Sequence, residues 1–310
     1  MESAPLYEDV ARAPEGGKAW WLITADGVRI RIGVWDQGQK GTVLLMPGRT
    51  EYIEKYGIII GGLRERGYAT IVNDWRGQGL ADRLLDDPDM GHVMEFADYQ
   101  HDVTAIIQAA NDLDLPRPYY LLSHSMGGCI ALRSLHEGLE VNAATFSAPM
   151  WGILMAPPMR PLAHGISWAS RGIGMGHKYA PGTNAESYVV TAPFEDNVLT
   201  TEAAMFDMMK EQAAAHPRFA LGGPSLNWLY QALKETRALM AMPAPDMPAL
   251  TYLGSNERIV DSKAVIKRMQ TWPEGRLEIL PGAEHEVLME KPKTREHVLD
   301  GMVALFSEHR

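Results

Sequence analysis

Between residues 119 and 128 the chain reads Tyr119-Tyr120-Leu121-Leu122-Ser123-His124-Ser125-Met126-Gly127-Gly128, and this is the most informative segment of the sequence. Its first part is an apolar run typical of a buried strand, and a helical pattern follows it as far as residue 136. Ser125 stands at the junction, with small residues two positions before it and two positions after it. A strand and a helix that almost touch need such small residues, so the stretch predicts a sharp turn that presents a serine.

The turn indicates that Ser125 is a nucleophile. A strained backbone at this position would point the hydroxyl away from the sheet, and the amides at the start of the following helix would lie near a developing oxyanion. The usual pattern is Gly-x-Ser-x-Gly, and Ser123 departs from it. Serine is the next larger residue whose side chain can still bond its own backbone. A purely structural turn with the same letters is the alternative.

Short apolar segments alternate with amphipathic ones on both sides of this turn, which is typical of βαβ units and a mostly parallel sheet. Ala25-Asp26-Gly27 separates the first two strands, which therefore form an antiparallel hairpin. The pattern predicts strands at 19–24, 28–35, 42–46, 69–75, 119–122, 143–147, 249–253 and 276–280, and helices at 54–66, 95–111 and 126–136, with 298–306 in a last helix. The fold class is therefore α/β, with helices on both faces of one central sheet.

A serine hydroxyl is a poor nucleophile without a base within hydrogen-bond reach and a carboxylate that orients the base. Of the ten histidines, His285 follows the strand at 276–280 through a short loop, at the edge of the sheet where α/β sites assemble. His124 adjoins the serine, and we expect it to pack beneath the turn. We predict that His285 is the base, and a loop histidine without a role is the alternative.

The loop after the strand at 249–253 offers two acids, Glu257 and Asp261. Asp261 immediately precedes a helical run, where an aspartate commonly caps a helix. Glu257 lies on the loop itself, nearer the strand end, so we favour Glu257 as the triad acid and keep Asp261 as the alternative acid. The chain order Ser125, Glu257, His285 is then the order found in α/β-hydrolases.

The loop after the strand at 42–46 supplies the second oxyanion donor in such a site. It reads Pro47-Gly48-Arg49-Thr50-Glu51-Tyr52, and its glycine lets the backbone turn its amides toward the serine. We predict the backbone N–H groups of Arg49 and Met126 as the two oxyanion donors. That role does not depend on their side chains.

Five segments carry a resemblance to a known family: Pro47-Gly48-Arg49-Thr50-Glu51-Tyr52, Asp74-Trp75-Arg76-Gly77-Gln78-Gly79-Leu80-Ala81-Asp82-Arg83, His124-Ser125-Met126-Gly127-Gly128, Gly254-Ser255-Asn256-Glu257-Arg258-Ile259-Val260-Asp261-Ser262-Lys263 and Gly282-Ala283-Glu284-His285-Glu286. In them the chain resembles the lysophospholipase / monoglyceride lipase family of α/β-hydrolases, which are serine hydrolases. The resemblance covers all but the N-terminus and most of the stretch between residues 149 and 247.

The resemblance implies the α/β-hydrolase fold with a helical cap insertion. It also implies that Glu257 is the triad acid, at a position where many members carry aspartate. The family's His-Gly oxyanion signature reads Pro47-Gly48 here. Membership would further imply hydrolysis of a monoacyl lipid ester, such as a lysophospholipid or a monoacylglycerol.

The alternation of strands and helices stops between about residues 149 and 248. We therefore predict a first part of the core at 1–148, a helical cap or lid at 149–247 and a second part of the core at 248–310. The cap is rich in methionine, whose flexible side chain can mould around an acyl chain. Met205, Met208 and Met209 also follow helical spacing, which equally fits burial against the core.

Composition limits the partners. The 310 residues are 46% hydrophobic and 22% charged, as in a globular enzyme, and the net charge of −10 argues against a nucleic-acid partner. The single cysteine, Cys129, excludes an internal disulfide and a cysteine-based zinc cluster, and we expect neither a metal nor a cofactor. Neither a secretory signal nor a long apolar span is visible in the sequence. We expect a cytoplasmic protein, and leave open its oligomeric state and a peripheral contact of the cap with a membrane.

The predicted function is hydrolysis of a small-molecule lipid ester by a Ser-His-Glu triad through an acyl-enzyme. Two alternatives use the same fold. A carboxylesterase, lactonase or thioesterase would keep the triad and act on a smaller substrate. A non-catalytic binding protein would need no intact triad.

Overall fold

The central feature of the computed structural model is one nine-stranded sheet in the order β1-β2-β3-β5-β4-β6-β7-β8-β9. The structure describes residues 1–155, 165, 167–168 and 174–310. Six neighbouring strands are parallel: β5 (Ala69–Asp74), β4 (Thr42–Met46), β6 (Tyr119–His124), β7 (Ala144–Ser147), β8 (Ala249–Gly254) and β9 (Gly275–Leu280). The other three, β1 (Glu2–Ser3), β2 (Lys18–Ile23) and β3 (Arg29–Trp35), form an antiparallel edge. The mostly parallel sheet that the sequence predicts is confirmed.

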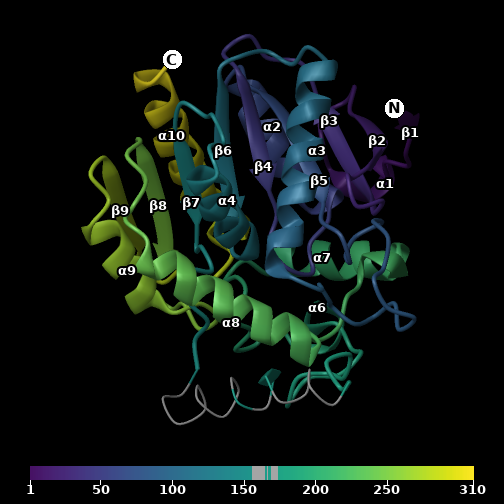
Figure 1. Cartoon of the computed structure of the whole chain (residues 1–310). Helices are drawn as coiled ribbons and strands as arrows, with labels where there is room; N and C mark the ends of the chain where they lie inside the picture. The colour runs from purple at the N-terminus through teal and green to yellow at the C-terminus, as the bar shows by residue number, and fades with distance from the viewer. Residues whose placement is uncertain (156–164, 166, 169–173) are drawn as a thin grey trace.

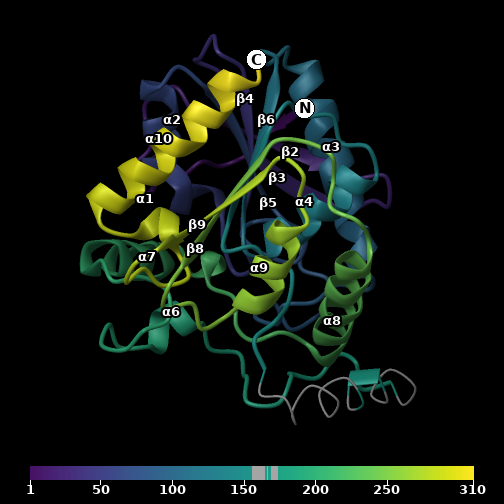
Figure 2. The same ribbon diagram turned by 90° about the vertical axis from the view of Figure 1, so that its left-hand side faces the viewer.

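Helices cover both faces of this sheet (Figures 1 and 2). On one face lie α2 (Gly57–Glu65) and α10 (Pro292–Glu308), and on the other lie α3 (Tyr99–Asp112), α4 (Met126–His136) and α9 (Ser262–Gln270). Successive residues of a strand point to opposite faces. In β4, Val43 and Leu45 therefore pack in the core under α2 and α10, whereas Leu44 and Met46 pack in the core under α3 and α4.

The expected elements are present, with changes at their ends. The helix expected at 54–66 begins as a 3₁₀ turn, Ile53–Tyr56, before α2. The helix expected at 95–111 begins in the same way with Phe96–Asp98, where Glu95 and Asp98 form a reciprocal capping box. The short strand β1 and the short helix α1 (Glu8–Ala11) were not expected from the sequence.

Between β7 and β8 the described residues add no strand to the central sheet. They form α6 (Tyr188–Thr191), α7 (Ala203–Ala215), the 3₁₀ turn Pro217–Phe219 and α8 (Leu226–Ala241), which gather beneath one end of the sheet in Figure 1. Residues 156–164, 166 and 169–173 of the predicted cap lie outside the described residues. Among the described helices, none is both long and apolar enough to cross a bilayer.

Candidate active site

Ser125 occupies the sharp turn between β6 and α4. Its backbone has φ 49° and ψ −116°, a left-handed region that a residue with a side chain rarely adopts. Three hydrogen bonds hold this conformation: the Ser125 N–H donates to the Ser147 carbonyl at 3.0 Å, and the Ser125 carbonyl accepts from the N–H groups of Gly128 at 2.9 Å and Met150 at 2.8 Å. The strained conformation is therefore fixed by the surrounding backbone.

Small residues flank this turn, as the sequence indicates. A Cβ on Gly127 would lie only 2.2 Å from the Met46 carbonyl oxygen, so the close approach of α4 to β4 requires glycine. Ser123 is completely buried in β6, between Met46 of β4 and Phe146 of β7. Its hydroxyl does not bond its own backbone. Since the strand ladders engage the backbone there, the Ser123 Oγ is buried without a hydrogen-bond partner among the described residues.

His285 and Glu257 form a direct, buried contact. The Nδ1 of His285 lies 2.7 Å from Oε2 of Glu257, and the two side chains are only 4% and 1% exposed. The other carboxylate oxygen of Glu257 accepts from the backbone N–H groups of Ile259 at 2.6 Å and Val260 at 3.0 Å. With Nδ1–H donated to the carboxylate, the neutral ring has Nε2 as its proton acceptor.

Asp261, the alternative acid, is the N-cap residue of α9. Its carboxylate accepts from the backbone N–H of Lys263 at 3.1 Å. The structure thus brings Glu257, rather than Asp261, to the His285 ring.

Side chains of the loop after β5 hold the predicted oxyanion loop in place. The Gln78 side-chain amide donates to the carbonyls of Gly48 at 2.8 Å and Glu51 at 2.9 Å, and the Trp75 indole N–H donates to the Pro47 carbonyl at 2.8 Å. In the described part of the chain, nothing accepts a hydrogen bond from the backbone N–H of Arg49. Side chains of a neighbouring segment therefore hold this loop in place.

Ser125, His285 and Arg49 line one cavity of about 540 Å³, a volume typical of a site for a small organic ligand. Most of its other lining side chains are apolar and come from the cap region and the loops beside it, among them Met150, Val198, Leu199, Met209, Phe219 and Trp228. Met205 and Met208, by contrast, are buried in the core under α2 and α10. Of the three methionines of α7 singled out in the sequence, only Met209 reaches the cavity.

A strained serine turn, a histidine–carboxylate pair and a mostly apolar cavity meet at the carboxyl ends of parallel strands. Comparison with known families leads to the same class of protein. The family model described as serine aminopeptidase, S33, matches residues 37–292, which is most of the chain. The chain belongs to this hydrolase family.

Individual members of the family are recognisably similar. The chain is 32% identical to "Lysophospholipase L2" of Escherichia coli (strain K12), over 86% of this chain and 80% of that protein. It is 24% identical to "Monoglyceride lipase" of Rattus norvegicus, over 90% of this chain and 86% of that protein. A solved structure, a soluble variant of monoglyceride lipase from Saccharomyces cerevisiae, has the same fold, with a TM-score of 0.73 at 19% identity over 96% of this chain and 98% of that one. The predictions of this family, of the α/β-hydrolase fold and of an ester hydrolase are confirmed.

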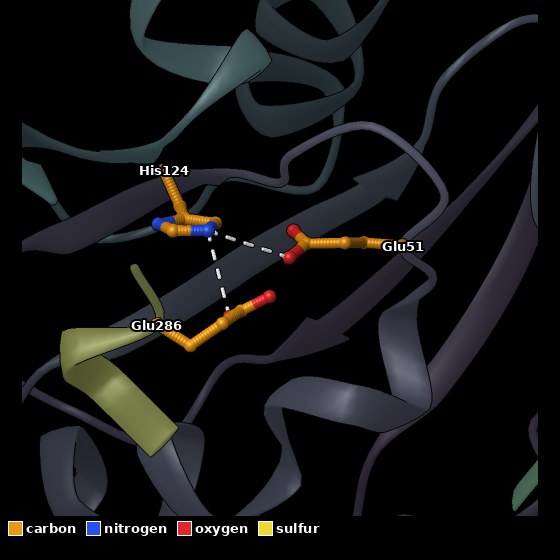
Figure 3. Close-up of side chains that lie close together, drawn as sticks. All are labelled: Glu51, His124 and Glu286. Atoms are coloured by element: carbon orange, nitrogen blue, oxygen red, sulfur yellow. Dashed lines mark ion pairs between the residues drawn. The ribbon is translucent and has the colours of Figure 1, made fainter. Parts of the chain in front are cut away.

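A cluster of charged side chains that the sequence reasoning missed lies around His124, the residue before Ser125. Figure 3 shows three of its members, Glu51, His124 and Glu286. The Lys55 ammonium lies 2.5 Å from Glu51 and 2.6 Å from Glu286, and the Tyr56 hydroxyl donates to Glu51 at 2.6 Å. The His124 Nε2 lies 3.6 Å from Glu51 and 3.4 Å from Glu286. The cluster joins the loop after β4, the serine turn and the loop that carries His285, so it fixes all three relative to one another.

Glu51, His124 and Glu286 are also the one group of three in the described residues whose ligand atoms lie close enough to share a metal ion. The Lys55 ammonium lies within ion-pair distance of both carboxylates. A divalent cation would have to displace this ammonium. Within the cluster the charge of Lys55 offsets the carboxylates, and burial keeps the pKa of His124 below its ordinary value of 6.5.

The environment of His285 leads to a prediction about pH. Burial lowers the pKa of the imidazole, but the charge and hydrogen bond of Glu257 and the carboxylates of Glu286 and Glu51 outweigh burial, so the pKa lies above 6.5. A protonated imidazole cannot accept a proton, so kcat/KM should rise with pH through an inflection above 6.5. NMR titration of the His285 ring should give the same inflection, and Glu257→Gln should lower it. An inflection below 6.5, or one that Glu257→Gln leaves in place, would contradict this account of the pair.

Proposed function

We propose that this protein hydrolyses carboxylic esters of monoacyl lipids, with Ser125 as nucleophile, His285 as general base and Glu257 as the carboxylate that orients the base. One observation carries the proposal. The serine turn and the buried His285–Glu257 pair, which are far apart along the chain, line or adjoin a single mostly apolar cavity. Together they make a hydroxyl nucleophilic and hold an acyl chain out of water.

In the proposed mechanism, His285 Nε2 removes the proton from the Ser125 hydroxyl while its oxygen attacks the ester carbonyl carbon. The carbonyl oxygen becomes an oxyanion, which the backbone N–H groups of Arg49 and Met126 stabilise. When the intermediate collapses, the alcohol leaves with the proton from His285 and the acyl group stays on Ser125. Water, deprotonated by His285, attacks this acyl-enzyme and releases the fatty acid and the free serine.

The substrate class follows from the cavity and from the relatives. The lining side chains are mostly apolar and include the serine, as an ester with one acyl chain requires. Similar proteins include one named lysophospholipase and one named monoglyceride lipase. Residues 149–247 act as the cap in this proposal, between core segments 1–148 and 248–310. In the cytoplasm, the cap would contact a membrane surface when it takes up a lipid.

A substrate panel tests the function. We expect kcat/KM to be higher for lysophospholipids or monoacylglycerols with long acyl chains than for short-chain esters, lactones and thioesters, because a long chain fills more of the apolar cavity. Initial rates at matched detergent concentrations would measure this. The outcome against the proposal is a preference for the short substrates, which would favour the carboxylesterase, lactonase or thioesterase alternative.

A further inference from the structure

Arg49 places an unpaired positive charge at the catalytic cavity. Its side chain is half-buried and lines the cavity together with Ser125 and His285. The guanidinium donates from Nη2 to the Gly222 carbonyl at 2.6 Å and lies 5.3 Å from the ring of Trp228. Its Nε is buried, and no acceptor for it exists among the described residues.

Two other buried arginines of this protein are neutralised by carboxylates, whereas a third, Arg268, donates to the backbone carbonyls of Met242 and Leu239. Arg31 lies 2.6 Å from Glu54 and 2.8 Å from Asp74. Arg76 is paired in the same way with two aspartates, at 2.6 and 2.8 Å. In the part of the chain that the structure describes, no carboxylate pairs with Arg49. An unpaired cation is costly to bury, so a group that arrives with the substrate is the natural partner.

The surroundings of Arg49 fit a charged guanidinium. Burial lowers its pKa only to about 10, so the group still carries its charge at neutral pH. A Cβ on Gly91 would lie 2.5 Å from Arg49 Nη2, so this glycine leaves the guanidinium its space. The other cation that lines the cavity, Lys55, is paired with two glutamates, and the lining Glu186 is exposed. Arg49 is therefore the free cation among the described residues that line the cavity.

We propose that the Arg49 guanidinium binds the phosphodiester of the substrate, so that the site selects lysophospholipids over uncharged monoacylglycerols. This inference rests on the proposed hydrolysis of monoacyl lipid esters. The fork of guanidinium N–H groups matches phosphate oxygens, with charge-assisted hydrogen bonds. The backbone of the same residue is the proposed oxyanion donor. About as many bonds separate the Arg49 backbone from its guanidinium as separate the ester carbonyl carbon of a lysophospholipid from its phosphorus.

A comparison of two substrates with the same acyl chain tests the selection. We would measure kcat/KM for a lysophosphatidylcholine and for the monoacylglycerol in the same neutral detergent. Arg49→Met should lower the ratio of kcat/KM for the lysophosphatidylcholine to kcat/KM for the monoacylglycerol by about 10- to 100-fold, because the phosphate loses one charged hydrogen-bonding partner. The change should come from a higher KM for the lysophospholipid. Arg49→Lys should restore part of the ratio, since lysine binds phosphate as a point charge. The control is Arg237→Met, an exposed arginine of α8 outside the cavity lining, which should leave the ratio unchanged.

The outcomes separate the two proposals. If wild-type protein hydrolyses neither lipid, the proposed function fails. If it hydrolyses them and Arg49→Met lowers both values equally, Arg49 only supports the loop through Gly222, and the inference is overturned. If the variants do not fold, inhibition of the wild-type protein provides the test. Glycerophosphocholine should inhibit monoacylglycerol hydrolysis competitively, whereas glycerol should not. Added salt should weaken the inhibition by glycerophosphocholine. Equal inhibition by both compounds would also overturn the inference.

Discussion

Ser125→Ala is expected to abolish ester hydrolysis almost completely, with a loss of kcat of about 10⁴-fold or more, as for removal of the nucleophile in other serine hydrolases. The acyl group would have no oxygen to bind, and the remaining rate would come from water and the oxyanion donors alone. His285→Ala should cause a loss of similar size, because serine and base act as one unit. Rates with a chromogenic ester, on protein whose folding is checked by circular dichroism, would measure both losses.

A matched serine variant controls for this substitution. Ser134 lies on α4, the helix that follows Ser125, and its hydroxyl donates to the Gln100 side chain at 2.7 Å. Ser134→Ala should reduce the free energy of unfolding by about 1 kcal/mol and leave kcat near the wild-type value. Removal of a nucleophile lowers kcat far more than about tenfold. If Ser125→Ala lost only about tenfold in kcat, another group would therefore be the nucleophile.

Glu257→Gln is expected to lower kcat by about 10⁴-fold, as the equivalent acid-to-amide change does in a well-studied triad. The amide has nearly the shape of the carboxylate but no charge, so it neither stabilises an imidazolium nor enforces the tautomer with the proton on Nδ1. The backbone N–H groups of Ile259 and Val260 would favour placing the amide oxygen on their side, which turns the NH₂ group toward His285. The ring would then have to present Nδ1 as an acceptor, with its proton on the nitrogen that should receive the serine proton.

Asp261→Asn is the matched control for this substitution. Asp261 caps α9, and asparagine is an equally good N-cap residue. Turnover of this variant should therefore stay within about a factor of two of the wild-type value. A larger loss of kcat in Asp261→Asn than in Glu257→Gln would make Asp261 the acid, the reverse of our assignment.

The elements of the site with a strong local pattern could be predicted from the sequence. The apolar run before Ser125 and the small residues around it predict the turn, because a strand and a helix that almost touch leave no room for larger side chains. The choice between Glu257 and Asp261 also followed from local rules, since an aspartate at the start of a helical run is accounted for as a cap. The structure places these two carboxylates accordingly.

Features that depend on contacts between distant segments could not be predicted. Gln78 holds the predicted oxyanion loop, which lies 30 residues earlier in the sequence. Lys55 pairs with Glu286, which lies 231 residues later. Nothing in the local pattern around these residues indicates a partner. One signal for these contacts was present in the sequence. Polar and charged residues, Glu51 and Gln78 among them, lie in the loops that directly follow apolar strands. The cation of Arg49 was likewise visible in the sequence, but its lack of a carboxylate became apparent only from the folded chain.

Covalent labelling tests the central claim most directly. The account predicts that a fluorophosphonate adds once to the wild-type protein, with loss of activity, and that mass spectrometry locates the adduct on Ser125. Preincubation with a slowly hydrolysed lysophospholipid should protect this serine, and Ser125→Ala should take up no label. Folded, wild-type protein that stays unlabelled, or that carries the adduct on another serine, would contradict the account.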